Sequence, residues 1–156
     1  MTVVVEIPGG SRNKYEMDHE TGAIYLDRML FTATRYPADY GFIEGTLGQD
    51  GDPLDALVFV GEPTFPGCHI VVRPLGVFVM RDEKGQDEKV LCVPVADPAS
   101  SHLKELEDLR PTLLAEIEHF FAVYKELEHK KVETHGFRDR EAALAIIDEA
   151  RARAES

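Results

Sequence analysis

The sequence is poor in cysteine: its 156 residues include only Cys68 and Cys92, each inside an apolar run. A disulfide framework needs more cysteines and a secreted chain, so we expect two buried thiols and a cytoplasmic protein. The N-terminus lacks the basic stretch, the long apolar stretch and the cleavage site of a secretory signal peptide. No apolar run approaches the roughly 18 residues that a membrane span requires. These absences argue against a secreted or membrane-spanning protein.

Positive charge is also scarce. The chain has 17 basic and 29 acidic residues, which gives a formal net charge of −12. Such a surface repels the phosphates of nucleic acids and anionic membranes, so we expect neither as a partner. The hydrophobic share of 44% and the charged share of 29% are ordinary for a globular protein. The length predicts a single domain over residues 1–156.

Several catalytic motifs are missing as well. The chain has no GxxxxGK[ST] loop, no GxGxxG, no HExxH and no GxSxG. Its six histidines form no HxH or HxxxH pair, so a zinc site is not expected. The sequence therefore argues against P-loop, dinucleotide-binding and zinc-peptidase chemistry.

The first two thirds of the chain predict short β-strands. Segments rich in β-branched residues are separated by turns that contain Gly or Pro. The expected strands are 3–7, 14–18, 23–28, 54–60, 69–74, 76–81 and 88–95, with a hairpin turn at 19–22. Their regular spacing is typical of a barrel or a sandwich.

The last third changes to helical spacing. Pro111 can open a helix, and apolar residues follow it on one face. They are Leu113, Ile117, Phe120, Phe121, Tyr124 and Leu127. A second helix is expected over 139–154, with Ala143, Ile146, Ile147 and Ala150 facing inward. Strands followed by helices predict the α+β class.

The segment 47–55 carries three carboxylates, Asp50, Asp52 and Asp55, in a stretch that Gly51 and Pro53 keep from being helical. Crowded carboxylates repel one another unless a cation neutralises them, and their oxygens suit Mg²⁺ or Ca²⁺. The spacing does not fit an EF-hand loop, whose sixth residue is Gly and whose twelfth is Glu. A metal site and a solvated acidic turn both remain open for this segment.

A second acidic cluster spans residues 80–89. Taken alone, a polar hairpin turn is its better interpretation. Asp82 and Asp87 nevertheless leave the ends of two expected neighbouring strands and could converge on one point. If that point faces the first cluster, the site could hold two divalent ions, an arrangement that supports phosphoryl hydrolysis.

Taken in order, these residues form blocks that resemble the bacterial family I soluble inorganic pyrophosphatases over nearly the whole chain. The block DGDPLD at 50–55 is close to diagnostic of that family. The blocks are Glu6-Ile7-Pro8, Lys14-Tyr15-Glu16, Asp27-Arg28, Tyr36-Pro37 with Tyr40-Gly41-Phe42, Asp50 to Asp55, Asp82 to Asp87 with Lys89, and His119-Phe120-Phe121 with Tyr124-Lys125.

The resemblance implies a closed five-stranded OB-like β-barrel with C-terminal helices packed on it. It implies a hydrolase that converts pyrophosphate to two phosphates, with several Mg²⁺ ions per site activating the attacking water. It also implies a cytoplasmic homo-oligomer, a hexamer.

The resemblance further assigns roles to individual residues. Asp52 is the implied general base, with Asp87 as a rival, and Glu16 is a supporting acid. The implied metal ligands are Glu6, Asp50, Asp55, Asp82 and Asp87, with Asp55 bridging two ions and Glu6 acting through water. The implied substrate contacts are Lys14, Arg28, Tyr40, Lys89, Tyr124 and Lys125.

One departure from the family pattern stands after the last expected strand, where Thr134 to Phe137 replace the usual tryptophan; the chain has no tryptophan at all. The departure affects local packing rather than the chemistry.

The implied site contains seven acids and four bases, a formal charge of −3 when all are ionised. About two Mg²⁺ ions would bring it to roughly +1. We therefore expect metal to bind before pyrophosphate or together with it.

Two other functions remain open. One is hydrolysis of another phosphoanhydride, although no platform for stacking a nucleotide base is visible. The other is a catalytically silent module that binds divalent cations, which would not need Lys14, Arg28, Tyr124 and Lys125 beside the acids.

Overall fold

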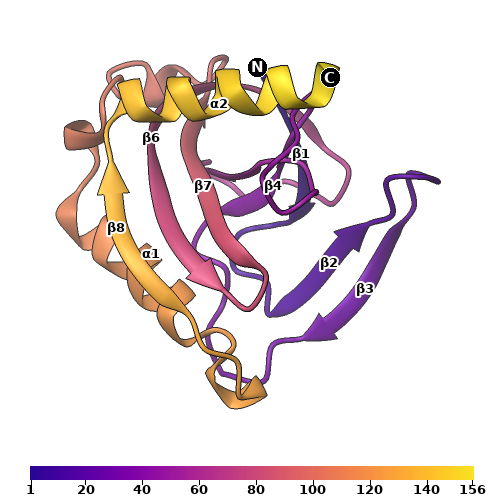
Figure 1. Ribbon diagram of the computed structural model, residues 1–156. Coiled ribbons are helices and arrows are strands. Elements are labelled where there is room, and N and C mark those ends of the chain that lie inside the picture. The colour runs from indigo at the N-terminus through magenta and orange to yellow at the C-terminus, as the bar shows by residue number, and fades with distance from the viewer.

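The computed structural model describes residues 1–156 and contains eight strands and two α-helices (Figure 1). The strands are β1 Thr2–Ile7, β2 Asn13–Met17, β3 Ile24–Met29, β4 Asp39–Ile43, β5 Asp55–Val58, β6 His69–Asp82, β7 Gly85–Pro94 and β8 Glu133–Arg138. The helices are α1 Pro111–Val123 and α2 Arg140–Glu155. The α+β class predicted from the sequence is thus confirmed.

Five strands close into a barrel. Their order is β1-β4-β5-β7-β6, and β1 pairs again with β6 through Thr2 opposite Val71, which completes the ring. The β5–β7 pair is parallel and the other pairs are antiparallel. β8 extends the sheet beyond β6, while β2 and β3 form a separate hairpin beside the barrel (Figure 1). The five-stranded barrel with C-terminal helices is confirmed.

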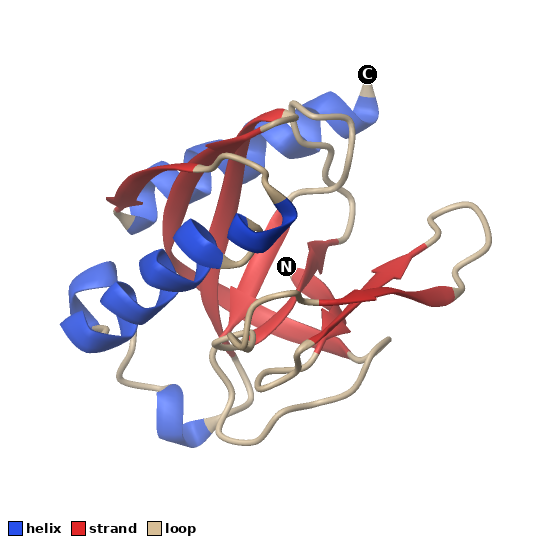
Figure 2. Ribbon diagram, turned by 90° about the horizontal axis from the view of Figure 1, so that it is seen from below, coloured by secondary structure: helices blue, strands red, loops and turns tan.

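The two helices pack on opposite faces of the β6 strand (Figure 2). Successive residues of a strand point to opposite faces. Phe78 and Met80 share a core cluster with Ile117 and Phe121 of α1. Val77 and Val79 contact the α2 side instead. The strand therefore carries one apolar layer for each helix.

Both predicted helices are present, but the prediction that Leu127 belongs to the apolar face of the first helix is wrong. α1 begins at Pro111, and its residues Ile117 and Phe121 are fully buried. Leu127 is 57% exposed, because the helix ends at Val123 and Leu127 lies in the following 3₁₀ turn. α2 is capped by Asp139, whose carboxylate accepts the backbone N–H of Ala142.

The predicted strands at 69–74 and 76–81 are wrong as separate elements, because they form the single strand β6. Pro74 has no N–H to donate, and the register shifts between Pro74 and Gly76. Leu75 is the extra residue of this β-bulge and is fully buried. The bulge bends β6 without ending it.

The sequence did not predict β4 and β8. β4 contains Gly41, where an added Cβ would lie 1.9 Å from the carbonyl oxygen of Val4. Only glycine permits this close approach of β4 to β1. The residue that makes β4 look like a poor strand is therefore the one that lets it pair.

The prediction of two buried thiols is half right. Cys92 is fully buried, Cys68 is partly exposed, and both are free thiols. None of the helices has the length and apolarity needed to cross a membrane.

Candidate active site

One open pocket lies between the barrel and the β2–β3 hairpin. It receives side chains from β1, from both hairpin strands, from the loop before β5, from the β6–β7 hairpin and from the end of α1. All thirteen residues that the sequence singled out line it. They are Glu6, Lys14, Glu16, Arg28, Tyr40, Asp50, Asp52, Asp55, Asp82, Asp87, Lys89, Tyr124 and Lys125.

Strand register assembles the centre of the pocket. In the parallel β5–β7 pair, Asp55 stands opposite Lys89. Asp87 lies two residues before Lys89 on β7, so both side chains point to the same face. Residues more than thirty positions apart in the chain thus meet because two strands run side by side.

The buried ammonium of Lys89 joins this centre together. Its Nζ donates to Asp55 Oδ2 at 3.0 Å, to Asp87 Oδ2 at 2.9 Å and to the Tyr40 hydroxyl at 2.7 Å. A lysine has three N–H donors, so all of them are used by protein groups. Lys89 is 1% exposed and lies 5.0 Å from the ring centres of Tyr40 and Phe121. Here it organises the cluster and has no free donor for a phosphate.

Three carboxylates of the pocket, those of Glu6, Asp50 and Asp87, have raised pKa values. Burial, with a smaller contribution from Asp55, raises the pKa of Glu6 to about 7, although the Met17 N–H bond at 2.9 Å opposes the rise. Burial likewise raises the pKa of Asp50, and the charge of Asp87 adds to it. Burial and the neighbouring Asp55 raise the pKa of Asp87 despite Lys89. Burial, helped by neighbouring carboxylates, thus disfavours the charged form of these three groups, a cost that a bound cation would offset.

Five of the six basic residues of the pocket are paired with acids, and Lys84 is the exception. Lys14 Nζ lies 3.0 Å from Asp27, and Lys125 Nζ lies 3.4 Å from Asp82. The guanidinium of Arg28 lies 2.5 Å from Asp27 and 2.9 Å from Glu128. These pairs hold the three cations in the lining of the pocket, in positions from which they can face an anion.

Tyr124 lines the pocket although the residue belongs to the apolar stripe. Tyr124 is 5% exposed, and its ring lies 5.4 Å from that of Phe120 and 5.3 Å from that of Phe121. The C-terminal end of α1 therefore supplies both core and pocket.

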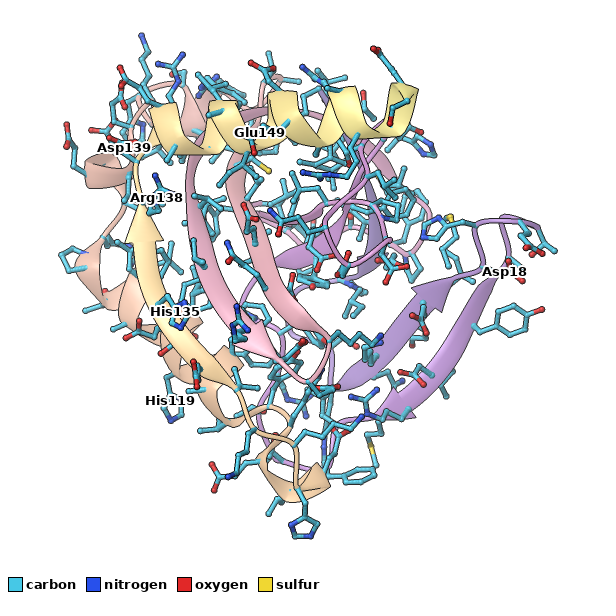
Figure 3. All side chains as sticks on the ribbon, in the orientation of Figure 1. Asp18, His119, His135, Arg138, Asp139 and Glu149 are labelled. Atoms are coloured by element: carbon cyan, nitrogen blue, oxygen red, sulfur yellow. The ribbon has the colours of Figure 1, made fainter.

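The donor set fits a hard divalent cation. The pocket contains nine carboxylates and six basic groups, a formal charge of −3, and it offers oxygen ligands of the type that Mg²⁺ prefers. No three acids already converge as a preformed metal cage, because Lys89 and Lys125 hold several of them. None of the six histidines lines the pocket; His119 on α1 and His135 on β8 lie across the barrel from the hairpin (Figure 3).

Sequence reasoning missed several pocket residues. Asp27 and Tyr36 stood inside the recognised blocks but received no role, although both line the pocket. Glu83, Lys84 and Lys130 line it too. Glu128 gave no signal at all, because it lies 100 residues from Arg28, the residue that it contacts.

Comparison with known proteins agrees with the resemblance. The family model described as inorganic pyrophosphatase matches residues 3–155. The inorganic pyrophosphatase of Methanosarcina mazei is 55% identical over 151 residues, which cover 97% of this chain and 89% of that protein. The inorganic pyrophosphatase of Streptomyces coelicolor is 58% identical over 147 residues, covering 94% and 90%.

A solved structure gives the same result. The inorganic pyrophosphatase from Helicobacter pylori superposes with a TM-score of 0.98 at 42% identity and covers 100% of this chain and 94% of that chain. The similarity in sequence and in fold thus extends over nearly the full length of this chain and of each protein compared with it. This protein belongs to the inorganic pyrophosphatase family and is an enzyme that hydrolyses pyrophosphate to phosphate.

Proposed function

We propose that the reaction depends on Mg²⁺ and takes place in the pocket between the barrel and the β2–β3 hairpin. One observation carries this proposal: the carboxylates suited to a metal and the cations suited to phosphate line the same pocket, whose formal charge is −3. Pyrophosphate is itself an anion, so a pocket of this charge needs added cations to accept it.

Glu6, Asp50, Asp55, Asp82 and Asp87 would hold the metal ions. Bound Mg²⁺ supplies positive charge against the phosphate oxygens and lowers the pKa of water. Lys89 keeps Asp55 and Asp87 apart at a fixed spacing, since one ammonium bonds both. This prearrangement reduces the cost of ordering the ligands when a cation enters.

Asp52 is the better candidate for the proton acceptor. It is exposed at the pocket and forms no ion pair, so its carboxylate oxygens are free to take a proton from water. Burial raises the pKa of Asp87, but its Oδ2 already accepts from Lys89 at 2.9 Å, so that oxygen is less accessible to a water molecule. Glu16 lines the same pocket from the β2–β3 hairpin and would support the acidic cluster.

Lys14, Arg28, Tyr40, Lys89, Tyr124 and Lys125 would contact the substrate. Lys14, Arg28 and Lys125 line the pocket, where their charges would stabilise phosphate oxygens as negative charge develops on the leaving group. For Lys89 a phosphate contact would require the exchange of one of its three hydrogen bonds, to Tyr40, Asp55 or Asp87, whereas the Tyr40 hydroxyl accepts from Lys89 and keeps its own proton to donate.

We further propose that the chain is a single domain and assembles as a cytoplasmic homohexamer. Several large apolar side chains are unusually exposed, including Tyr25, Leu26, Phe65 and Val71, each between 58% and 62%. Light scattering should give six times the 17.4 kDa of one chain. A mass near that of one chain would contradict the assembly.

Phosphate release from pyrophosphate tests the reaction. Purified protein is assayed with Mg²⁺, with Ca²⁺ and with EDTA, alongside Asp52→Asn. Release with Mg²⁺ that is absent with EDTA and lost in the variant supports the metal dependence and Asp52 as proton acceptor. Full activity in EDTA would contradict the first point, and full activity of the variant would contradict the second.

A further inference from the structure

The loop 47–53, which carries Asp50 and Asp52, is bonded mainly to itself. Gly48 N–H donates to Asp52 O at 2.6 Å, and Asp52 N–H donates to Asp50 Oδ1 at 3.0 Å. Gly51 N–H donates to Gly48 O at 3.2 Å. These bonds give the loop its shape but do not fix that shape against the barrel.

The loop is fixed to the barrel at its first residue by α2. Leu47 N–H donates to Ala150 O at 3.0 Å, and Arg153 Nη1 donates to Leu47 O at 2.5 Å. Arg153 is the one side chain from outside 46–54 that forms a hydrogen bond to this loop. α2 is itself anchored, because Ala143, Ile147 and Ala150 are buried against the barrel.

The guanidinium of Arg153 also lies close behind the acidic cluster. A small polar pocket between α2 and the loop is lined by Arg153, by Glu149 (labelled in Figure 3), and by Asp50, Asp55 and Asp87. The same three aspartates line the candidate active site from the other side. Arg153 therefore stands directly behind the carboxylates that would bind metal.

We infer that Arg153 is a positioning residue that holds the Asp50–Asp52 loop in the geometry needed to bind divalent cations. The inference rests on the proposed Mg²⁺ site. Arg153 lines the pocket behind the loop and is absent from the lining of the candidate active site, so it would act through the backbone of Leu47.

Two effects of removing Arg153 have opposite signs, which makes the inference testable. Loss of a positive charge beside three aspartates strengthens their attraction for a cation. Loss of the bond to Leu47 loosens the loop and weakens cation binding. Only the positioning role predicts weaker binding from the removal of a positive charge.

The experiment is calorimetric titration of metal-free protein with Mg²⁺, comparing wild type, Arg153→Ala and Arg153→Lys. Residues that support metal ligands from behind typically contribute a factor of ten or more in affinity, and Arg153 acts one step further away. We expect Arg153→Ala to weaken Mg²⁺ binding by about 3- to 10-fold. We expect Arg153→Lys, which keeps the charge and one donor, to recover most of that loss.

Arg151→Ala is the matched control. Arg151 lies on the same helix, is exposed and approaches only Asp148 at 3.9 Å, so its loss changes net charge equally without touching the loop. Wild-type affinity is expected for this variant. Equal weakening in Arg151→Ala, or unchanged or tighter binding in Arg153→Ala, would overturn the inference.

Thermal unfolding in EDTA shows whether each variant folds. If Arg153→Ala does not fold, Arg153→Gln replaces it: weaker binding than Arg153→Lys supports the inference, and equal binding overturns it. A wild-type protein that binds no Mg²⁺ would overturn the proposed function, whereas wild-type binding that Arg153→Ala leaves unchanged overturns this inference alone.

Discussion

At the scale of single residues, the site depends on buried charges that compensate one another. Burial opposes the charge on Lys89, yet Asp55 and Asp87 raise its pKa well above the ordinary value. The ammonium is in effect an internal counter-ion for two carboxylates. The cluster is therefore held together without metal, although it remains negative overall.

Replacing Lys89 tests this compensation. Lys89→Met removes the ammonium and leaves Asp55 and Asp87 facing each other without a counter-ion. Breaking a buried ion pair by removing one partner costs about 3–5 kcal/mol, so we expect a loss of about 3 kcal/mol in unfolding free energy, because both aspartates are partly exposed. Urea unfolding in EDTA measures it. Mg²⁺ should restore part of the lost stability. An identical loss with and without Mg²⁺ would contradict the idea that Lys89 and Mg²⁺ both neutralise Asp55 and Asp87.

Glu6 gives a prediction with a defined pH window. Its pKa is raised from 4.5 to about 7 in the folded protein, mainly by burial. A raised carboxyl pKa means that folding favours the protonated form, so stability is lost as pH rises from about 4.5 through about 7. The shift corresponds to about 3 kcal/mol at most.

Glu6→Gln isolates this contribution, because glutamine resembles the protonated carboxyl at every pH. In EDTA, we expect the variant to match wild type near pH 4.5 and to be more stable by up to about 3 kcal/mol at pH 8. Urea unfolding at both pH values measures the difference. If wild type and variant differ equally at pH 4.5 and pH 8, the raised pKa is not the cause.

At the scale of secondary-structure elements, α1 connects the core to the pocket. On its buried face, the ring centre of Phe121 lies 5.7 Å from that of Phe78 and 5.3 Å from that of Tyr124. Tyr124 and Lys125 at its end line the pocket. A loss of packing in α1 therefore reaches the site directly.

Phe121→Ala tests the packing of α1. Phe121 is fully buried, so truncation removes apolar contacts and leaves a cavity that costs about 3–5 kcal/mol. The control is Leu127→Ala, which the sequence placed on the same face but which is 57% exposed. We expect that control to change the unfolding free energy by less than about 0.5 kcal/mol. Comparable losses for both variants in urea unfolding would contradict the packing described here.

Elements with strong local patterns could be predicted from the sequence, and elements held by tertiary contacts could not. The helical spacing after Pro111 and the turn residues 19–22 are local signals, so α1 and the β2–β3 hairpin could be predicted. β4 was missed because Gly41 is explained only by its contact with Val4. The closing pair of β1 with β6 joins distant segments, and only the family resemblance implied it.

In the candidate site, too, residues in local sequence patterns could be predicted and residues held by tertiary contacts could not. The DGDPLD block and the Asp82 to Asp87 turn are local patterns of acids, and both lie at the pocket. Arg153 and Glu128 reach their partners across 106 and 100 residues, so no local pattern marks them. Local chemistry can be read from the sequence, whereas the supporting contacts require the fold.

At the scale of the whole molecule, the protein is an anion that must bind an anion. Its net charge is −12, and the pocket contributes −3 of that total. Long-range attraction therefore does not bring pyrophosphate in. From this balance we expect cations to neutralise the pocket before the substrate enters or while it enters.

This order predicts how substrate binding depends on metal. We expect methylenediphosphonate, a non-hydrolysable analogue of pyrophosphate, to give no measurable calorimetric binding in EDTA and clear binding with Mg²⁺. Asp52→Asn should still bind the analogue with Mg²⁺, because the substitution removes a negative charge while leaving the phosphate contacts in place.

High salt distinguishes two reasons why the analogue would not bind in EDTA. At 1 M ionic strength the Debye length is about 3 Å, so pure repulsion would be screened and binding would partly return. If divalent cations must bridge the carboxylates and the phosphates, salt cannot replace them, and this is the outcome we expect. Tight binding of the analogue in EDTA at low salt would contradict the charge balance on which the proposed mechanism rests.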